Sequence, residues 1–198
     1  MAGRILKLLM YALSHPGQIF KCIYYKLRME RFGWSSIIEK PLKIDGINNI
    51  CIGDKVIIQH RTWLASLPLT GERSSELVIK DGCIIGHYNH IYSTKSIIIN
   101  KNVLTADRVY ISDNIHGYED INIPIFKQTV KQMGKVEIGE GSWLGENVCV
   151  IGASIGKHCV IGANSVVTKD IPDYSVAVGS PARVIKRYNF DEQKWVRI

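Results

Sequence analysis

The sequence predicts an all-β solenoid in which the chain coils as a parallel β-helix. The first observation behind this prediction is a six-residue repeat in residues 138–172. Its units begin at Ile138, Leu144, Ile155 and Ile161, and each opens with an aliphatic residue followed by Gly. An α-helix has about 3.6 residues per turn and would scatter positions six apart around its circumference, whereas stacked short strands keep them on one face. A repeat of this length is typical of the parallel β-helix.

The second observation is that the repeat continues towards the N-terminus. Residues 99–116 keep the same period, and residues 52–58 resemble an opening coil. The composition is the third observation, because 46% of residues are hydrophobic but only 9% are aromatic, as ladders of aliphatic side chains require. Four isoleucines lie six positions apart at Ile79, Ile85, Ile91 and Ile97. The repeat then shifts by two positions and continues from Ile99.

Two long interruptions divide the repeat. Residues 65–76 form a charged, serine-bearing run that predicts a surface loop. Residues 116–135 separate the two most regular blocks, so we expect them to project from the coil, and such loops are often functional. We therefore expect a β-helix domain over residues 41–187, an N-terminal helical segment over 1–40, and a C-terminal tail over 188–198 that packs back on the domain.

The first 32 residues carry most of the net charge. Six basic residues against one acidic residue give +5 of the formal +7. Residues 5–13 have helical spacing that ends at Pro16-Gly17, and a second apolar and basic stretch covers 19–32. One interpretation is that these segments are helices that pack on the open end of the coil or on a neighbouring subunit. The other is that they attach the protein to an anionic membrane surface. Nucleic acid is not an expected partner, because the basic residues alternate with aliphatic ones and no binding module is present.

Cysteine usage and hydropathy indicate a cytoplasmic protein. The five cysteines are scattered without paired spacing, which is typical of reduced thiols rather than of disulfides or a zinc cage. No stretch reaches the length of a membrane span. The apolar run from Leu6 to Leu13 is interrupted by Lys7 and lacks a small-residue cleavage site, so we expect no signal peptide. Peripheral contact with the inner face of the cell membrane remains open.

Two C-terminal segments carry a family resemblance. Residues 161–172 read IGANSVVTKDIP, and residues 178–186 read VGSPARVIK. Together they are similar to the C-terminal signature of the hexapeptide-repeat, left-handed β-helix acyltransferases, particularly the maltose, galactoside and polysaccharide O-acetyltransferases. The resemblance covers residues 99–188. One departure is that the turn between Val150 and Ile155 is one residue shorter than usual.

The resemblance implies acetyl transfer from acetyl-CoA to a hydroxyl of a sugar or lipid-linked glycan, at sites between the subunits of a homotrimer. The catalytic histidine of the family corresponds to His116, in the segment ISDNIHGY of residues 111–118. A neutral imidazole can accept the hydroxyl proton near pH 7. The structural alternative is a loop histidine that caps a turn.

Five further residues match positions that line the coenzyme groove or approach the phosphates in this family, whereas Trp143 either walls the acetyl end of the groove or simply covers a corner of the coil. A small side chain at Ala163 would let the pantetheine arm lie against the coil, and Lys169, Arg183 and Lys186 would offer cations to the phosphates. A backbone N–H near Gly145 is the family-like donor to the acetyl oxyanion. The complete expected set is Trp143, Gly145, Ala163, Thr168, Lys169, Arg183 and Lys186.

Asn89 and His90 are the candidate acceptor-binding residues, because related sugar acetyltransferases place an asparagine about one coil before the catalytic histidine. The alternative for Asn89 is an inward position in the fifth place of its hexad.

Three other functions compete with this interpretation. A serine or antibiotic acetyltransferase is the nearest. A zinc enzyme resembling γ-carbonic anhydrase would use His87 or His90 with His116, but the further histidine expected after His116 is absent, since position 121 is Ile121. We therefore expect no metal cofactor. A non-catalytic scaffold would have no use for the cations at Lys169 and Arg183.

Overall fold

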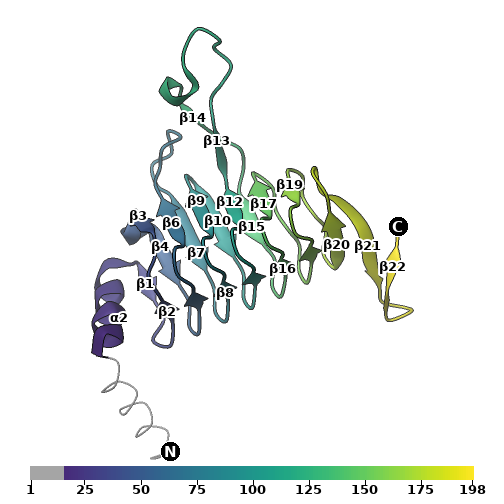
Figure 1. The fold of residues 1–198 in the computed structure, drawn as a ribbon, viewed down its shortest axis with the longest axis horizontal. Coiled ribbons are helices and arrows are strands. Elements are labelled where there is room, and N and C mark those ends of the chain that lie inside the picture. Colours follow the sequence, from purple (N-terminus) through teal and green to yellow (C-terminus); the bar gives the residue numbers. More distant parts are fainter. Residues whose placement is uncertain (1–15) are drawn as a thin grey trace, which may run out of the picture.

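The computed structural model describes residues 16–198, which form a parallel β-helix whose coils succeed one another from the N-terminal to the C-terminal end (Figure 1). Three sheets surround one core. Sheet A contains β1 (Arg31–Phe32), β4 (Ile50–Ile52), β7 (Glu76–Ile79), β10 (Ser96–Ile99) and β15 (Val136–Ile138). Sheet C contains β3 (Lys43–Asp45), β6 (Trp63–Ser66), β9 (His90–Ser93), β12 (Tyr110–Ser112), β17 (Cys149–Ile151) and β19 (Val166–Val167).

Sheet B extends further than the other two. Its parallel strands are β2 (Ile37–Ile38), β5 (Ile57–Ile58), β8 (Ile84–Ile85), β11 (Leu104–Thr105), β16 (Trp143–Leu144), β18 (Val160–Ile161) and β20 (Ser175–Val178). The antiparallel strands β21 (Arg183–Asn189) and β22 (Lys194–Arg197) complete it, so residues 188–198 lie at the edge of this sheet. The other elements are α2 (Pro16–Arg28), the 3-10 helices η1 (Ile47–Asn49) and η2 (Ile125–Lys127), and the hairpin strands β13 (Asn114–His116) and β14 (Val130–Gln132).

The aliphatic positions of the repeat point into the core. Each coil passes through sheets A, B and C in turn, and within one coil Ile79, Ile85 and Ile91 are all fully buried at intervals of six residues. Ile79 pairs with Ile99 of the next coil, twenty residues later. Each buried isoleucine contributes about 1.5–3 kcal/mol by leaving water.

Departures from the repeat occur at one corner, where the chain passes from sheet C to sheet A. Ile99 follows Ile91 by eight positions instead of six, which accounts for the phase shift in the sequence. Ile155 follows Val150 by only five positions. The longest insertion, residues 113–135, contains β13, η2 and β14 and projects beyond the coil (Figure 1). This arrangement confirms the predicted solenoid and its projecting loop.

Helix α2 covers the N-terminal end of the coil. Tyr25 in the helix and Met29 just after it are buried, and the Tyr25 ring lies 5.4 Å from the ring of Phe32 in β1. The opposite side of the helix exposes Phe20 and Leu27. The predicted helical segment is thus confirmed for its second part, whereas residues 5–13 lie outside the described residues. In residues 16–198 no helix is both long and apolar enough to cross a membrane.

Candidate active site

A cavity of about 510 Å³ lies where the projecting hairpin meets the outer face of sheet C. The hairpin supplies one wall and the strands β6, β9, β12 and β17 supply the other. The lining residues are Trp63, Leu69, His90, Tyr92, Tyr110, Asn114, Ile115, His116, Val130 and Ile151. Apolar and aromatic side chains with a few polar groups are typical of pockets that bind small molecules.

Aromatic rings stacked from coil to coil form the floor of this cavity. Trp63, His90 and Tyr110 are register partners in successive strands of sheet C. The rings of Trp63 and His90 are nearly parallel, 6° apart with centroids separated by 4.2 Å, and Tyr110 follows at 5.2 Å from His90. The Trp63 indole N–H donates to the Asp45 carboxylate at 2.8 Å, which fixes the first ring of the stack.

His90 presents an unused hydrogen-bonding atom in the cavity. Its Nε2 is buried and has no hydrogen-bond partner among the described residues. Desolvation by burial lowers the pKa of the His90 imidazole, because removal from water disfavours the charged ring. The ring is therefore neutral at pH 7, and Nε2 becomes available to a polar group of a bound molecule only where the side chains that bury it move aside.

His116 enters the same cavity from the hairpin. It ends β13, pairs with Val130 of β14, and its side chain is exposed. The structure thus brings His116 and His90 to one cavity from opposite walls.

Asp113 anchors the base of the hairpin. Its carboxylate is fully buried and accepts backbone N–H groups from Thr94, Lys95 and Ser96 at 2.7–2.9 Å. Burial alone would raise the pKa of Asp113, but hydrogen bonds from Asn114 and Thr94 and from the corner backbone outweigh it and lower this pKa. The corner from β9 to β10 therefore fixes the direction in which β13 leaves the coil.

Asn89 does not reach the cavity. Its side chain is only 1% exposed, its amide nitrogen donates to the Ala106 carbonyl at 2.9 Å, and its carbonyl oxygen accepts the Val109 N–H at 3.0 Å. The amide therefore holds two coils together from an inward position, and we leave Asn89 out of the proposed acceptor site.

Gly145 and Ala163 lie together at the corner between sheets B and C. A Cβ atom on Gly145 would approach the Ala163 nitrogen to 2.7 Å, so this position requires a glycine. The Gly145 N–H donates to the Ile161 carbonyl at 2.8 Å. This N–H belongs to the coil ladder, so an oxyanion donor would have to be another backbone N–H near Gly145.

The other expected coenzyme residues lie towards the C-terminal end. Thr168 and Lys169 follow β19 and are exposed, and Arg183 begins β21. Neither Lys169 nor Arg183 makes an ion pair with a described residue. Lys186 is half-buried opposite Val176, and Trp143 is exposed on β16. None of these residues lines the cavity that contains His116.

Sequence reasoning did not find Trp63, Tyr92 or Tyr110. A signal for two of them is present, because each of Trp63 and Tyr110 directly precedes a core aliphatic residue of sheet C. Outward positions that repeat once per coil share one face, so aromatic residues there predict a stack.

The histidines considered for a zinc site resembling that of γ-carbonic anhydrase can be located in one chain. Among the described residues, neither His90 nor His116 belongs to a group of three metal-binding side chains.

Comparisons with known proteins agree with this fold. Residues 135–169 match the family model described as the hexapeptide repeat of succinyl-transferase. The chain is 39% identical over 127 residues to the "Putative lipopolysaccharide biosynthesis O-acetyl transferase WbbJ" of Escherichia coli (strain K12), covering 60% of this chain and 64% of the relative. It is 34% identical over 152 residues to the "Putative acetyltransferase YJL218W" of Saccharomyces cerevisiae (strain ATCC 204508 / S288c), covering 76% and 62%. The chain thus spans less than two thirds of the length of either relative.

Two solved structures have similar folds. One is AntD, an N-acyltransferase from Bacillus cereus in complex with dTDP and 3-hydroxybutyryl-CoA, with a TM-score of 0.69 and 22% identity over 84% of this chain and 87% of that one. The other is the hexapeptide-repeat containing acetyltransferase VCA0836 from Vibrio cholerae O1 biovar eltor with acetyl coenzyme A, with a TM-score of 0.54 and 22% identity over 83% and 74%.

The protein is a left-handed parallel β-helix built from hexapeptide repeats. Its resemblance to the hexapeptide-repeat acyltransferases is thereby confirmed.

Proposed function

We propose that the protein is an acetyl-CoA-dependent O-acetyltransferase that acts on a hydroxyl group of a sugar or glycan. The observation that carries this proposal is the cavity in which His116 faces the aromatic stack of Trp63, His90 and Tyr110. Aromatic faces suit the apolar C–H faces of a sugar ring, while a nearby imidazole suits its hydroxyl groups. The similarity to an O-acetyl transferase of lipopolysaccharide biosynthesis supports this acceptor class.

In the proposed mechanism, His116 acts as the general base. The neutral imidazole takes the proton from the acceptor hydroxyl while its oxygen attacks the thioester carbonyl of acetyl-CoA. The tetrahedral intermediate collapses with cleavage of the carbon–sulfur bond, and the imidazolium returns the proton to the departing thiolate. The products are an acetyl ester and free coenzyme A. His90 would accept a hydrogen bond from the acceptor through its free Nε2.

The coenzyme would bind along the C-terminal coils. Ala163 is exposed, and its small side chain would let the pantetheine arm lie against the corner between sheets B and C. Thr168 and the cations at Lys169, Arg183 and Lys186 would hold the phosphates. Trp143 would wall the acetyl end. Because none of these residues lines the cavity that contains His116 in one chain, we propose that the site is completed between subunits of a homotrimer.

An apolar column on the outer face of sheet B supports oligomer formation. Ile57, Ile84, Leu104 and Trp143 are register partners in adjacent strands, and their side chains are 37–47% exposed. A continuous exposed apolar surface is typical of a protein interface. We expect light scattering to give the mass of a trimer for the wild type and a monomer for Ile84→Glu, with Val78→Glu on sheet A as the matched control. A monomeric wild type would contradict the homotrimer.

The surface of α2 supports a site of action at the inner face of the cell membrane. Phe20 and Leu27 are exposed on the helix that carries Lys21 and Lys26, and the Lys26 ammonium lies over the exposed Trp34 ring after β1; such mixtures bind anionic bilayers. The full-length protein should sediment with vesicles containing phosphatidylserine and not with neutral vesicles, and Leu27→Glu should abolish this. Equal recovery with both vesicles would contradict membrane contact.

The test of the reaction is a mass-spectrometric screen of sugar acceptors incubated with the protein and acetyl-CoA. We expect a product heavier by one acetyl group that is released by mild base, because esters hydrolyse readily and amides do not. Matched amino sugars serve as the control. Acetylation of the amine alone would replace the O-acetyltransferase proposal with N-acetylation.

A further inference from the structure

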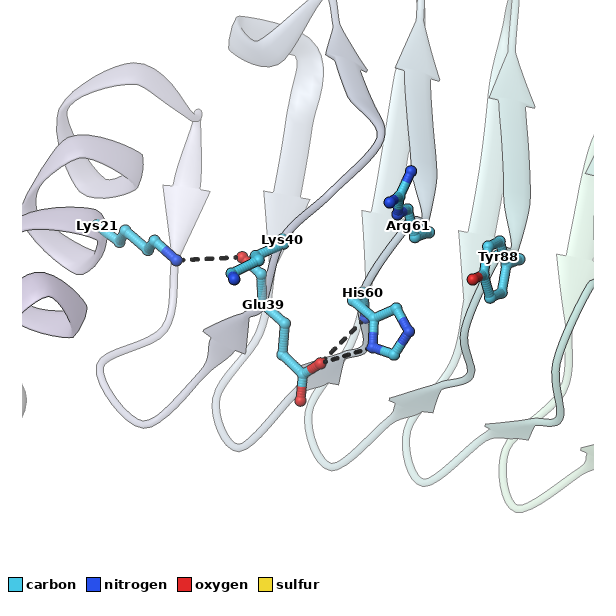
Figure 2. Close-up of a pocket in the computed structure, with 6 residues that line it drawn as sticks. All are labelled: Lys21, Glu39, Lys40, His60, Arg61 and Tyr88. Carbon is cyan, nitrogen blue, oxygen red and sulfur yellow. Dashed lines mark hydrogen bonds and ion pairs between the residues drawn. The ribbon is translucent and has the colours of Figure 1, made fainter.

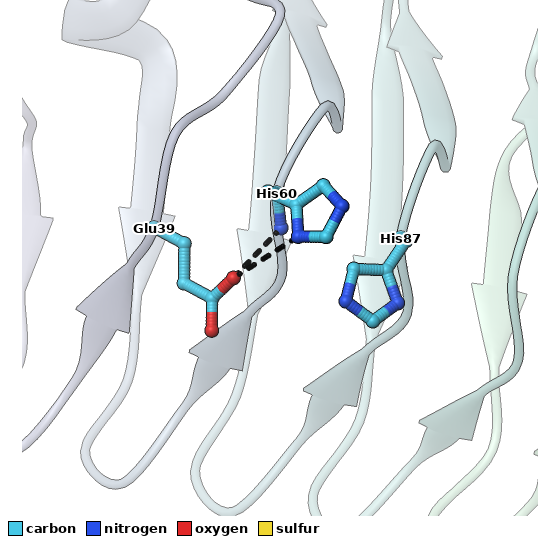
Figure 3. A group of neighbouring side chains, drawn as sticks. All are labelled: Glu39, His60 and His87. Carbon is cyan, nitrogen blue, oxygen red and sulfur yellow. Dashed lines mark hydrogen bonds and ion pairs between the residues drawn. The ribbon is translucent and has the colours of Figure 1, made fainter.

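A second group of chemically suited side chains lies outside the proposed active site, at the corner between sheets B and C of the first coils. Glu39, His60 and His87 follow β2, β5 and β8, which are neighbouring strands. One ligand atom from each of these residues lies within 4.8 Å of the others (Figure 3). We infer that Glu39, His60 and His87 form a zinc site within one chain.

The spacing of the first two ligands suits a tetrahedral zinc ion. Glu39 Oε2 lies 3.5 Å from His60 Nδ1. Zinc–nitrogen and zinc–oxygen bonds of about 2.1 Å place two ligands of a tetrahedron about 3.4 Å apart. Strands on neighbouring coils are about 4.8 Å apart, so side chains from equivalent corners need to converge only slightly.

His87 is oriented for the same ion by a residue behind it. Its Nδ1 lies 3.1 Å from Asp107 Oδ1, and the same oxygen accepts the His87 backbone N–H at 2.9 Å. In Figure 3 the other ring nitrogen of His87 is directed to the side on which Glu39 and His60 lie. When Nδ1 donates its proton to the carboxylate, Nε2 keeps a free lone pair, and carboxylate–histidine–zinc arrangements use this geometry.

The charge around the group is compatible with a divalent cation. Glu39 and Asp107 together balance the two charges of zinc. The ammonium group of Lys21 donates to the backbone carbonyl of Glu39 at 3.4 Å and leaves the carboxylate free (Figure 2).

The group opens on one side into a cavity of about 570 Å³. Lys21, Lys40 and Arg61 line this cavity together with Tyr88, Glu39 and His60 (Figure 2). Three protein ligands would therefore leave a fourth zinc position facing a basic cavity, where water or an oxygen anion completes the tetrahedron.

The test titrates zinc chloride into the full-length protein, stripped with a chelator, by calorimetry. We expect one equivalent per chain in the wild type, at least hundredfold weaker binding in His87→Gln, and about 10–100-fold weaker binding in Asp107→Asn, the loss typical of a residue that orients a zinc ligand. His158→Gln removes an exposed histidine on another coil and should leave binding unchanged.

Cobalt(II) provides a second readout that does not depend on activity. The wild type loaded with cobalt should show the intense visible absorption of a four-coordinate ion, and His60→Gln should lose it. Circular dichroism checks that each variant is folded. Zinc affinity that is equal in the wild type and in folded His87→Gln would overturn the site.

Discussion

His90 stacks on Trp63 with ring centroids 4.2 Å apart and planes 6° apart, and the buried Nε2 atom of His90 has no partner among residues 16–198. An unpaired polar atom at the edge of an aromatic stack is costly unless a ligand uses it. The two rings cover each other's faces and present their edges, so the pair offers apolar ring edges together with one unpaired ring nitrogen to a bound sugar.

Removing either member of this pair should weaken acceptor binding. We expect Trp63→Ala to raise the KM for the acceptor about tenfold, since aromatic contacts contribute about 0.5–1.5 kcal/mol beyond their buried area. His90→Phe keeps the stack but loses the acceptor atom and should raise the same KM. The KM for acetyl-CoA is the control in steady-state kinetics. An unchanged acceptor KM in both variants would remove the stack from the site.

His90 should also make stability depend on pH. The lowered pKa means that the unfolded chain protonates this ring at about pH 6.5, whereas the folded protein does so only at lower pH. The contribution of the neutral His90 ring to the free energy of unfolding is therefore fully present above pH 6.5, and it is lost as the pH falls below that value. Urea unfolding at several pH values should show a smaller loss of stability on acidification in His90→Phe than in the wild type. Identical pH profiles would contradict this.

Asp113 should act as a positioning residue for His116. Asp113→Ala leaves the N–H groups of Thr94, Lys95 and Ser96 without their acceptor, which costs about 3 kcal/mol in the free energy of unfolding. We expect kcat to fall while the KM for acetyl-CoA stays constant, because the hairpin that carries His116 loses its anchor. Stabilisation by the Asp113 carboxylate is present above its unfolded pKa and lost as the pH falls through the lower folded pKa.

Thr94→Val is the matched comparison for Asp113, since it removes the hydroxyl that contacts the Asp113 carboxylate and Gln132 Oε1 but keeps the three backbone bonds. Its effects should have the same direction and be smaller. A kcat unchanged in folded Asp113→Ala would show that the hairpin does not need this anchor.

The C-terminal cations should recognise the coenzyme phosphates. Lys169→Ala and Arg183→Ala should each raise the KM for acetyl-CoA about tenfold, the loss of roughly 1.4 kcal/mol expected for a charge-assisted hydrogen bond. Acetyl-dephospho-CoA lacks the 3′-phosphate, so a variant that has lost the group binding this phosphate should no longer distinguish the two coenzymes. If both variants still distinguish acetyl-CoA from acetyl-dephospho-CoA as well as the wild type does, neither Lys169 nor Arg183 binds the 3′-phosphate.

The coil was predictable because its core repeats along the chain. Isoleucines six apart, as at Ile79, Ile85 and Ile91, report the period directly, and the shift to Ile99 located the corner where residues are inserted. Asn89 was harder to interpret, because a buried amide that joins two coils and an acceptor-binding amide occupy neighbouring positions in the sequence.

The group of Glu39, His60 and His87 could not be predicted from local spacing, and the aromatic stack becomes predictable only when the strands of sheet C are aligned. Glu39, His60 and His87 are separated by 21 and 27 residues, and these intervals become neighbouring corners only when the loop length of each coil is known. The stack of Trp63 on His90 depends on the same register.

The central claim is best tested by following thiol release from acetyl-CoA with the acetylated sugar as a second readout, in the wild type and in His116→Ala. Calorimetry establishes that both proteins bind the coenzyme. We expect the wild type to acetylate the acceptor and His116→Ala to be about 10²–10⁴-fold slower, with unchanged coenzyme affinity. Equal turnover by the two proteins would contradict His116 as the base, and failure of the wild type to bind acetyl-CoA would contradict the proposed activity itself.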